Sequence, residues 1–194
     1  ADQTINSVTV GKGANSVAGN TVLGENALDA AVSGINNTAI GKNALTENTS
    51  GTQNTAVGMG CLDAVTNAAD NTGVGYAAGS ATTGASNTFI GSSSGESNTS
   101  GHSNAALGKR SLYKNTTGNS NTALGKDALY ENTTASYNTA VGTDALQANT
   151  TGTANTAVGQ GSLDENTTGS YNVSLGSGAL GKNSTAGSNV AVGY

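Results

Sequence analysis

The sequence predicts an all-β protein: a parallel β-solenoid, or β-roll, with about 17 residues per coil, roughly 11 coils and near-zero helix. Three observations predict this fold. A phrase of the type Asn-Thr-Ala-aliphatic-Gly recurs at a nearly fixed interval, the scarce large apolar residues gather at two positions of the repeat, and Gly and Asn separate the short segments. The pattern indicates one domain over residues 1–194, with an irregular first coil over 1–24 and regular 17-residue repeats over 25–194.

The Gly that ends the phrase marks the period. The step from Gly24 to Gly41 is one full period, and every later step has the same length except the one from Gly75 to Gly91, which is one position shorter. An irregular phrase ending at Gly11 precedes Gly24 by a still shorter step. At about 3.3 Å per extended residue, one repeat closes a turn of roughly 56 Å, and neighbouring turns would lie about 4.8 Å apart, so the repeat fits one coil of a solenoid. The markers are Gly24, Gly41, Gly58, Gly75, Gly91, Gly108, Gly125, Gly142, Gly159, Gly176 and Gly193.

Two columns of aliphatic residues are predicted to stack into the core ladder. Only 30 of the 194 residues are Leu, Val, Ile or Phe, and most of them fall directly before the marker (position −1) or four places after it (position +4). Gly79 and Gly95 replace the +4 Leu in two repeats. The −1 column is Leu23, Ile40, Val57, Val74, Ile90, Leu107, Leu124, Val141, Val158, Leu175 and Val192. The +4 column is Leu28, Leu45, Leu62, Leu112, Leu129, Leu146, Leu163 and Leu180.

The phrase itself is predicted to be a short strand. Side chains alternate between the two faces of a strand, so positions −1 and −3 share one face and positions −2 and −4 share the other. We expect the −1 aliphatic and the −3 Thr to face the core. The small side chains at position −2 and the Asn at position −4 would then form the outer face, either a solvated wall or a trimer contact. The Asn column is expected to form an Asn ladder: Asn20, Asn37, Asn54, Asn71, Asn87, Asn104, Asn121, Asn138, Asn155, Asn172 and Asn189.

The composition argues against several classes of function. Seven Lys and Arg in a chain of net charge −5 cannot line a phosphate-binding groove, and no apolar run is long enough to span a membrane, so no nucleic-acid partner or membrane insertion is expected. The only His, His102, is interpreted as a solvated loop residue, and the only Cys, Cys61, as a buried small filler. The sequence predicts no enzyme, no catalytic residues, no metal site and no cofactor.

Charged and aromatic residues that lie one period apart test whether equivalent positions of adjacent coils are neighbours. Opposite charges lie one period apart in Glu25 and Lys42, Arg110 and Asp127, Lys114 and Glu131, and Glu165 and Lys182. Like charges also coincide, as in Lys109 and Lys126. Tyr113 and Tyr130 occupy the same position of adjacent repeats, so they form either a candidate surface contact for a sugar or receptor, or a cross-coil aromatic pair.

Glycosylation sequons recur at one turn of the repeat. In a glycosylating host they would carry sugars, and the alternative is that an Asn-Thr-Thr turn matches the sequon by chance. The possible glycosylation sites are Asn48, Asn115, Asn132, Asn149, Asn166 and Asn183.

The phrases NSVTVG, and NTAIG followed by xxAL, resemble the head repeats of YadA-like trimeric autotransporter adhesins. The array NTAVGxxALxxNTTG is also similar to repeats of phage tail-fibre-type proteins. The resemblance implies a left-handed parallel β-roll, commonly trimeric, displayed on the cell surface or the virion.

Two functions follow as expectations. The first is an extracellular structural fibre protein, an adhesin or tail-fibre-like shaft or a filament subunit. It would assemble with itself as a homotrimer or a head-to-tail homopolymer, with a host-surface glycan or protein as a further partner. The alternative is an ice-binding β-solenoid, which needs Thr columns on a flat outer face. The inward position expected for the −3 Thr counts against that alternative.

Overall fold

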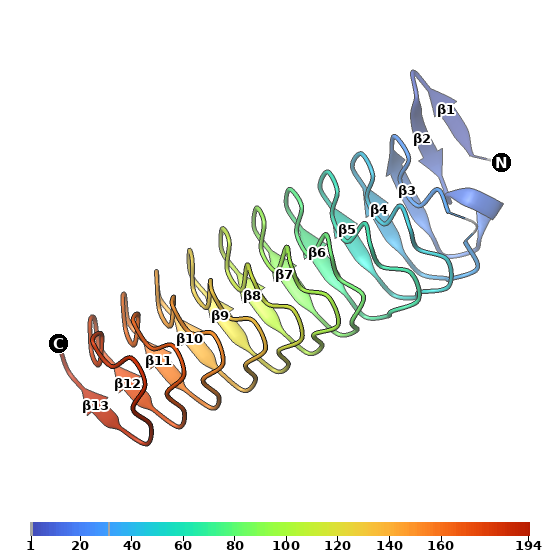
Figure 1. Cartoon of the computed structure of the whole chain (residues 1–194). Coiled ribbons are helices and arrows are strands. Elements are labelled where there is room, and N and C mark those ends of the chain that lie inside the picture. Colours follow the sequence, from blue (N-terminus) through green and yellow to red (C-terminus); the bar gives the residue numbers. More distant parts are fainter. Residues whose placement is uncertain (1, 31) are drawn as a thin grey trace.

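The chain winds into a row of similar coils stacked along one axis (Figure 1). This computed structural model describes residues 2–30 and 32–194; Ala1 and Ala31, both inside the predicted domain, lie outside the described residues. One sheet of 13 strands runs the length of the row in chain order, with the two termini at opposite ends. The predicted all-β parallel solenoid is confirmed, and the only helical segment among the described residues is the short 3-10 turn η1 (Ala14–Ser16).

The strands fall on the repeated phrase, and each of the regular ones ends at or next to the marker Gly. They are β1 (Gln3–Ile5), β2 (Val8–Gly11), β3 (Thr21–Gly24), β4 (Thr38–Ile40), β5 (Thr55–Val57), β6 (Thr72–Val74), β7 (Thr88–Ile90), β8 (Ala105–Leu107), β9 (Thr122–Leu124), β10 (Thr139–Val141), β11 (Thr156–Val158), β12 (Val173–Leu175) and β13 (Val190–Val192).

From β3 onward, each strand pairs in parallel with the equivalent strand of the next coil. Leu124 of β9 is paired with Leu107 on one side and Val141 on the other. The one shorter step keeps this register too, since Thr72 of β6 pairs with Thr88 of β7. The missing residue is absorbed in a turn, where Gly84 donates to the Thr99 carbonyl much as Gly51 donates to that of Thr66. The coil length read from the sequence is therefore the true winding period.

The N-terminal segment departs from the prediction of an irregular first coil. β1 and β2 form an antiparallel hairpin, and β2 is antiparallel to β3. Val10 is paired with Leu23, as stacking of the phrases suggested, but its strand runs the opposite way. The step from Gly11 to Gly24 is too short to complete a coil, so the chain reverses direction instead.

The strand alternates as predicted, but with the opposite face inward. At position −2, Ala39, Ala56, Ala123, Ala140 and Ala157 are buried, as are ten of the Asn residues at position −4. The −1 aliphatics and −3 Thr lie on the outer side, where Leu107 is 49% and Leu124 42% exposed. The prediction of a −1 core ladder is wrong for the whole column: Leu23, Ile40, Val57, Val74, Ile90, Leu107, Leu124, Val141, Val158, Leu175 and Val192.

The narrow interior of the coil explains why the face with the small side chains, and not the aliphatic face, is buried. The +4 Leu residues fill the interior from the opposite wall, and all except the half-buried Leu180 are fully buried, as predicted. Little room is left opposite them. At Gly73, position −2 of β6, even a Cβ would collide with Cys61 Sγ and would lie 2.9 Å from Leu62 Cγ. Most coils have Ala at position −2, and a larger side chain is buried there only in β3, as Val22, and in β7, as Phe89, where Gly replaces the +4 Leu in two repeats. The small side chains of position −2 therefore suit the narrow interior, and the aliphatics of position −1 lie outside.

Hydrogen bonds make Asn suitable for the interior. In the predicted −4 ladder, the Asn37 amide N–H donates to Asn20 Oδ1 (2.8 Å), and Asn37 Nδ2 donates to the Gly51 carbonyl (2.9 Å). The same pattern continues to Asn189. Each side chain thus ties its own coil to the next one and satisfies buried backbone groups, which would otherwise be costly to bury.

Left-handed backbone recurs in every coil. The marker glycines from Gly41 onward have φ between +126° and +140°, as a glycine corner requires. The +4 Leu residues also have positive φ, between +49° and +54°. Where Gly79 and Gly95 replace Leu, the ring of Phe89 at position −2 fills the space. A Cβ on Gly79 would be 2.6 Å from Phe89 Cδ2.

Candidate functional site

The outer sheet face, which we define as positions −3 and −1 of β3 to β13, is the most regular exposed feature. Thr occupies position −3 in most coils and an aliphatic residue occupies position −1 in all of them. The strands carrying them are parallel and in register, so both columns run along the sheet with a spacing of about 4.8 Å. The result is a long stripe of Thr beside a long stripe of Val, Leu and Ile.

The Thr stripe is interrupted at β8. Ala105 stands where neighbouring strands have Thr88 and Thr122, and a shallow apolar hollow of about 180 Å³ lies there between Ile90, Leu107 and Leu124. Its lining exposes no polar surface. At this point the outer sheet face offers only hydrocarbon, which favours contact with another apolar surface over contact with solvent.

The four predicted ion pairs between adjacent coils are all present. Lys42 lies 3.1 Å from Glu25, Lys114 lies 2.8 Å from Glu131, and Lys182 pairs with Glu165. Arg110 binds Asp127 through two hydrogen bonds of 2.8 Å, and Lys126 adds a contact of 2.9 Å. Burial opposes ionisation of Asp127, but these hydrogen bonds outweigh it and lower the pKa of the carboxyl group below its usual value.

Tyr113 and Tyr130 form the cross-coil aromatic pair. Their ring centroids lie 5.1 Å apart with the planes within 8° of parallel. Arg110 Cζ lies 5.1 Å and Lys114 Nζ 5.5 Å from the centroid of Tyr130. These rings are half-buried and bind one another and two cations, so they brace neighbouring coils. A role for them in contacting a ligand stays a prediction.

The sequon residues from Asn115 to Asn183 form a second internal ladder, and Asn48 donates to the Gly51 carbonyl within its own coil. Asn132 Nδ2 donates to Asn115 Oδ1 (2.8 Å) and to the Ala135 carbonyl (3.0 Å), and Asn149 repeats the arrangement on Asn132. The atom that would carry a glycan is thus a buried donor, so the predicted glycosylation does not fit the folded coil. This correction applies to Asn48, Asn115, Asn132, Asn149 and Asn166, which are fully buried, and to Asn183, which is half-buried.

The single Cys and the single His of the chain lie in different environments. Cys61 is buried in the small-residue column as expected, and burial raises the pKa of its thiol to about 12. His102 is exposed, with its ring 3.3 Å from Ser103 Oγ. Within residues 2–30 and 32–194, no group of three or more His, Cys, Asp or Glu is arranged to hold a metal ion, and no helix has the length and hydropathy needed to cross a membrane.

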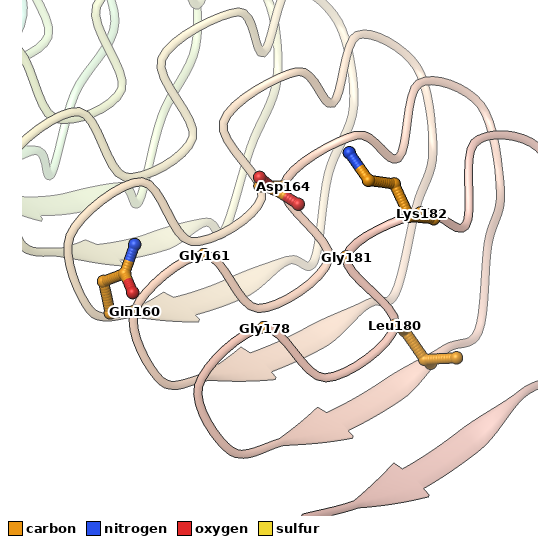
Figure 2. A pocket seen from close by; sticks show the side chains of 7 residues that line it. All are labelled: Gln160, Gly161, Asp164, Gly178, Leu180, Gly181 and Lys182. Atoms are coloured by element: carbon orange, nitrogen blue, oxygen red, sulfur yellow. The ribbon is translucent and has the colours of Figure 1, made fainter. Parts of the chain in front are cut away.

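A larger hollow, of about 470 Å³, lies on the last coils of the described chain (Figure 2). It opens where Gly161, Gly178 and Gly181 remove side chains, and Asp164 and Lys182 stand at its rim. Sequence reasoning missed it, although glycine in columns that elsewhere hold Asp, Asn or Tyr was the available signal. Asp164 and Lys182 are the charged residues of its lining, and Lys182 also pairs with Glu165.

Comparison with known proteins adds no family to these findings. No protein-family model matches the chain, and no curated protein or solved structure does so either. The geometry of the outer sheet face therefore carries the functional argument.

Proposed function

We propose that the protein is an extracellular structural fibre protein, an adhesin or tail-fibre-like shaft, whose chains associate through the outer sheet face. The observation that carries the proposal is the unbroken −1 stripe. Large exposed residues such as Leu107, Leu124 and Leu175 follow one another on a parallel sheet that extends over roughly 50 Å. Monomeric soluble proteins rarely keep so long an apolar patch in water.

A homotrimer is the assembly we favour, because three rods can turn this one face toward a common axis and bury it at once. This assembly agrees with the resemblance of the repeated phrase to trimeric β-roll heads, which also motivates the extracellular location and the left-handed winding. Head-to-tail stacking is the other assembly we consider, and it would leave the stripe uncovered.

Native mass spectrometry and light scattering test the proposal. We expect a discrete trimer that Leu107→Lys and Leu124→Lys together convert to monomer, since each places a charge in the stripe. Met59→Lys is the matched control, because Met59 is equally exposed at 48% but lies outside the outer sheet face. A wild-type monomer at all concentrations refutes the proposal, and a mass that grows without limit indicates head-to-tail stacking.

Ice binding is a second candidate, favoured by one specific observation. The −3 Thr residues, which sequence reasoning placed inside, lie on the outer sheet face beside the aliphatic stripe. A flat, regular array of hydroxyl and methyl groups is the kind of surface that can order water as a lattice does. The same face cannot serve both roles at once, so the two proposals exclude each other.

Thermal hysteresis measurements separate them. An ice-binding monomer would show hysteresis that Thr122→Lys and Thr139→Lys abolish, while Met59→Lys leaves it intact. A trimer without hysteresis rejects this candidate.

A further inference from the structure

Two tyrosines stand out on the turn that precedes the strand. Tyr137 and Tyr171 occur in the same tripeptide, Ser-Tyr-Asn, two coils apart. They are among the most exposed large side chains, at 69% and 67%. Both have left-handed backbone, with φ of +63° and +61°.

This conformation is unfavourable for an aromatic residue. A side chain with a Cβ costs roughly 1–2 kcal/mol in the left-handed region, and Asn and Asp tolerate it best. The same position in other coils holds Gly19, Asn36, Gln53, Asp70, Ala154 or a Ser. Neither tyrosine ring is stacked on another ring or on a cation within the described part of the chain. The two tyrosines thus carry a backbone cost with most of each side chain in solvent, which points to an external contact.

The backbone sets the two side chains in equivalent positions. The Tyr137 amide donates to the Asn119 carbonyl and the Tyr171 amide to that of Thr153, both at 3.0 Å. Two inter-strand steps separate them, which is roughly 10 Å. Ala154 occupies the same position in the intervening coil, so no large side chain from that column fills the space between them.

Hydroxyl groups flank both rings. Ser136 Oγ accepts a hydrogen bond from the Asn119 amide, and Ser170 Oγ accepts one from the Thr153 amide, each at 2.9 Å. Each hydroxyl keeps its own proton for a further acceptor. No charged residue occurs in the segments 132–143, 145–163 and 166–181. The chain segments that carry the rings are therefore uncharged and rich in hydrogen-bonding groups.

We propose that Tyr137 and Tyr171, with Ser136 and Ser170, form a binding site for a neutral polysaccharide. A sugar ring has an apolar C–H face, which stacks on an aromatic ring, and a rim of hydroxyls, which pair with Ser. Two such positions roughly 10 Å apart suit separate sugar units of one extended chain. The absence of charge in those three segments disfavours acidic glycans and nucleic acid. The site does not depend on the proposed fibre assembly.

Native gel electrophoresis in gels containing hydroxyethylcellulose, xyloglucan, galactomannan or dextran tests the site. We expect at least one of these neutral polymers to retard the wild-type protein. Retardation should be lost in the double variant Tyr137→Asn with Tyr171→Asn. The matched control is Tyr76→Asn, which removes a 56% exposed tyrosine from a different turn position and should keep the retardation.

A stability measurement on the same variants separates binding from folding. Because Asn tolerates left-handed backbone, the double variant should unfold at a higher temperature than wild type while it loses retardation. Unchanged migration of the wild type in all four gels overturns the proposal, as does a double variant that is still retarded. A lower unfolding temperature contradicts the strain argument. Native mass should be the same for all variants, so the outcome is independent of the trimer test.

Discussion

Phe89→Ala tests how the narrow interior of the solenoid is filled. Phe89 is fully buried, and its ring takes the space left where Gly79 and Gly95 replace the +4 Leu. Truncation of a buried Phe to Ala costs about 3–5 kcal/mol, more when the surroundings cannot collapse. The flanking coils are held by hydrogen bonds of 2.8 Å from Thr72 to Asn87 and from Thr88 to Asn104. We therefore expect a loss of about 4–5 kcal/mol.

The same reasoning predicts a rescue. Gly79 and Gly95 have φ of +61° and +59°, close to the values of the Leu residues in the other coils. The triple variant F89A/G79L/G95L rebuilds the arrangement used elsewhere in the chain and should recover most of the lost free energy. Gly95→Leu alone should instead destabilise the protein, because its side chain would collide with the Phe89 ring. Leu at position 95 thus destabilises the protein when residue 89 is Phe and stabilises it when residue 89 is Ala.

Urea titration followed by circular dichroism measures these free energies. A solenoid can unfold one group of coils at a time as well as all at once. The dependence of the unfolding free energy on urea concentration is therefore compared between variants first, because midpoints report stability only when this slope is unchanged. Leu129→Ala, in a distant coil, is the control: it should lose about 2–5 kcal/mol that G79L/G95L does not restore. A triple variant no more stable than F89A alone would refute the proposed coupling.

Four further predictions concern single residues. Gly125→Ala should cost about 3 kcal/mol or more in thermal unfolding, because its φ is +135° and the new Cβ would lie 2.5 Å from the Gly142 carbonyl oxygen; Gly178→Ala, in open space, should lose only about 1 kcal/mol. Asn132→Ala strands the buried acceptors of Asn115 and Ala135 and should cost about 2–4 kcal/mol in the same assay. The lowered pKa of Asp127 means that its contribution is present above the usual carboxyl pKa of about 4 and is lost as pH falls below it. Asp127→Asn should therefore show a smaller drop in unfolding temperature between pH 7 and pH 3, whereas Asp63→Asn, which removes a carboxyl of raised pKa, should show a larger one. Cys61 should resist a thiol reagent at neutral pH until urea unfolds the chain, and rapid native labelling would contradict its burial.

The period of the sequence was sufficient to predict which residues meet across coils. A shift of one period brings a side chain to the equivalent place in the next coil, so pairs such as Arg110 and Asp127 could be named without coordinates. The stacking of Tyr113 on Tyr130 followed from the same shift. Only the N-terminal hairpin escaped this reasoning, because a phrase that resembles the repeat does not reveal the direction of its strand.

The period did not determine which face of the strand is buried. The alternation of side chains along the strand is the same whichever face is buried. The usual assumption that the more hydrophobic face is inside gave the wrong face here. The decisive quantity is the width left by the +4 Leu of the opposite wall, which most coils fill with a residue as small as Ala56, although Val22 is buried there in β3. The buried hydrogen bonds of the Asn residues were equally invisible, because they depend on backbone groups of the next coil.

The positive φ of the +4 Leu residues could have been predicted from the Gly residues that replace Leu in two coils. Full burial of a Leu contributes about 1.5–3 kcal/mol, which offsets the roughly 1–2 kcal/mol cost of positive φ. A position that holds Leu in eight repeats and Gly in two others is difficult to explain by hydrophobicity, since Gly contributes none. It is readily explained by a backbone conformation that Gly adopts freely and that Leu accepts only when burial compensates.

Comparing the coils with one another shows how much each position of the outer sheet face varies. Position −3 varies: Ala105, Val173 and Val190 replace Thr, as a partly solvent-exposed position permits. Position −1 is just as exposed, yet every coil has Val, Leu or Ile there, and packing within the chain does not require it, because the core is complete on the other side of the strand. A large aliphatic side chain retained at an exposed position in coil after coil is what the proposed association through the outer sheet face would require. This constancy favours a protein partner over ice, for which the Thr column would be the more constant of the two.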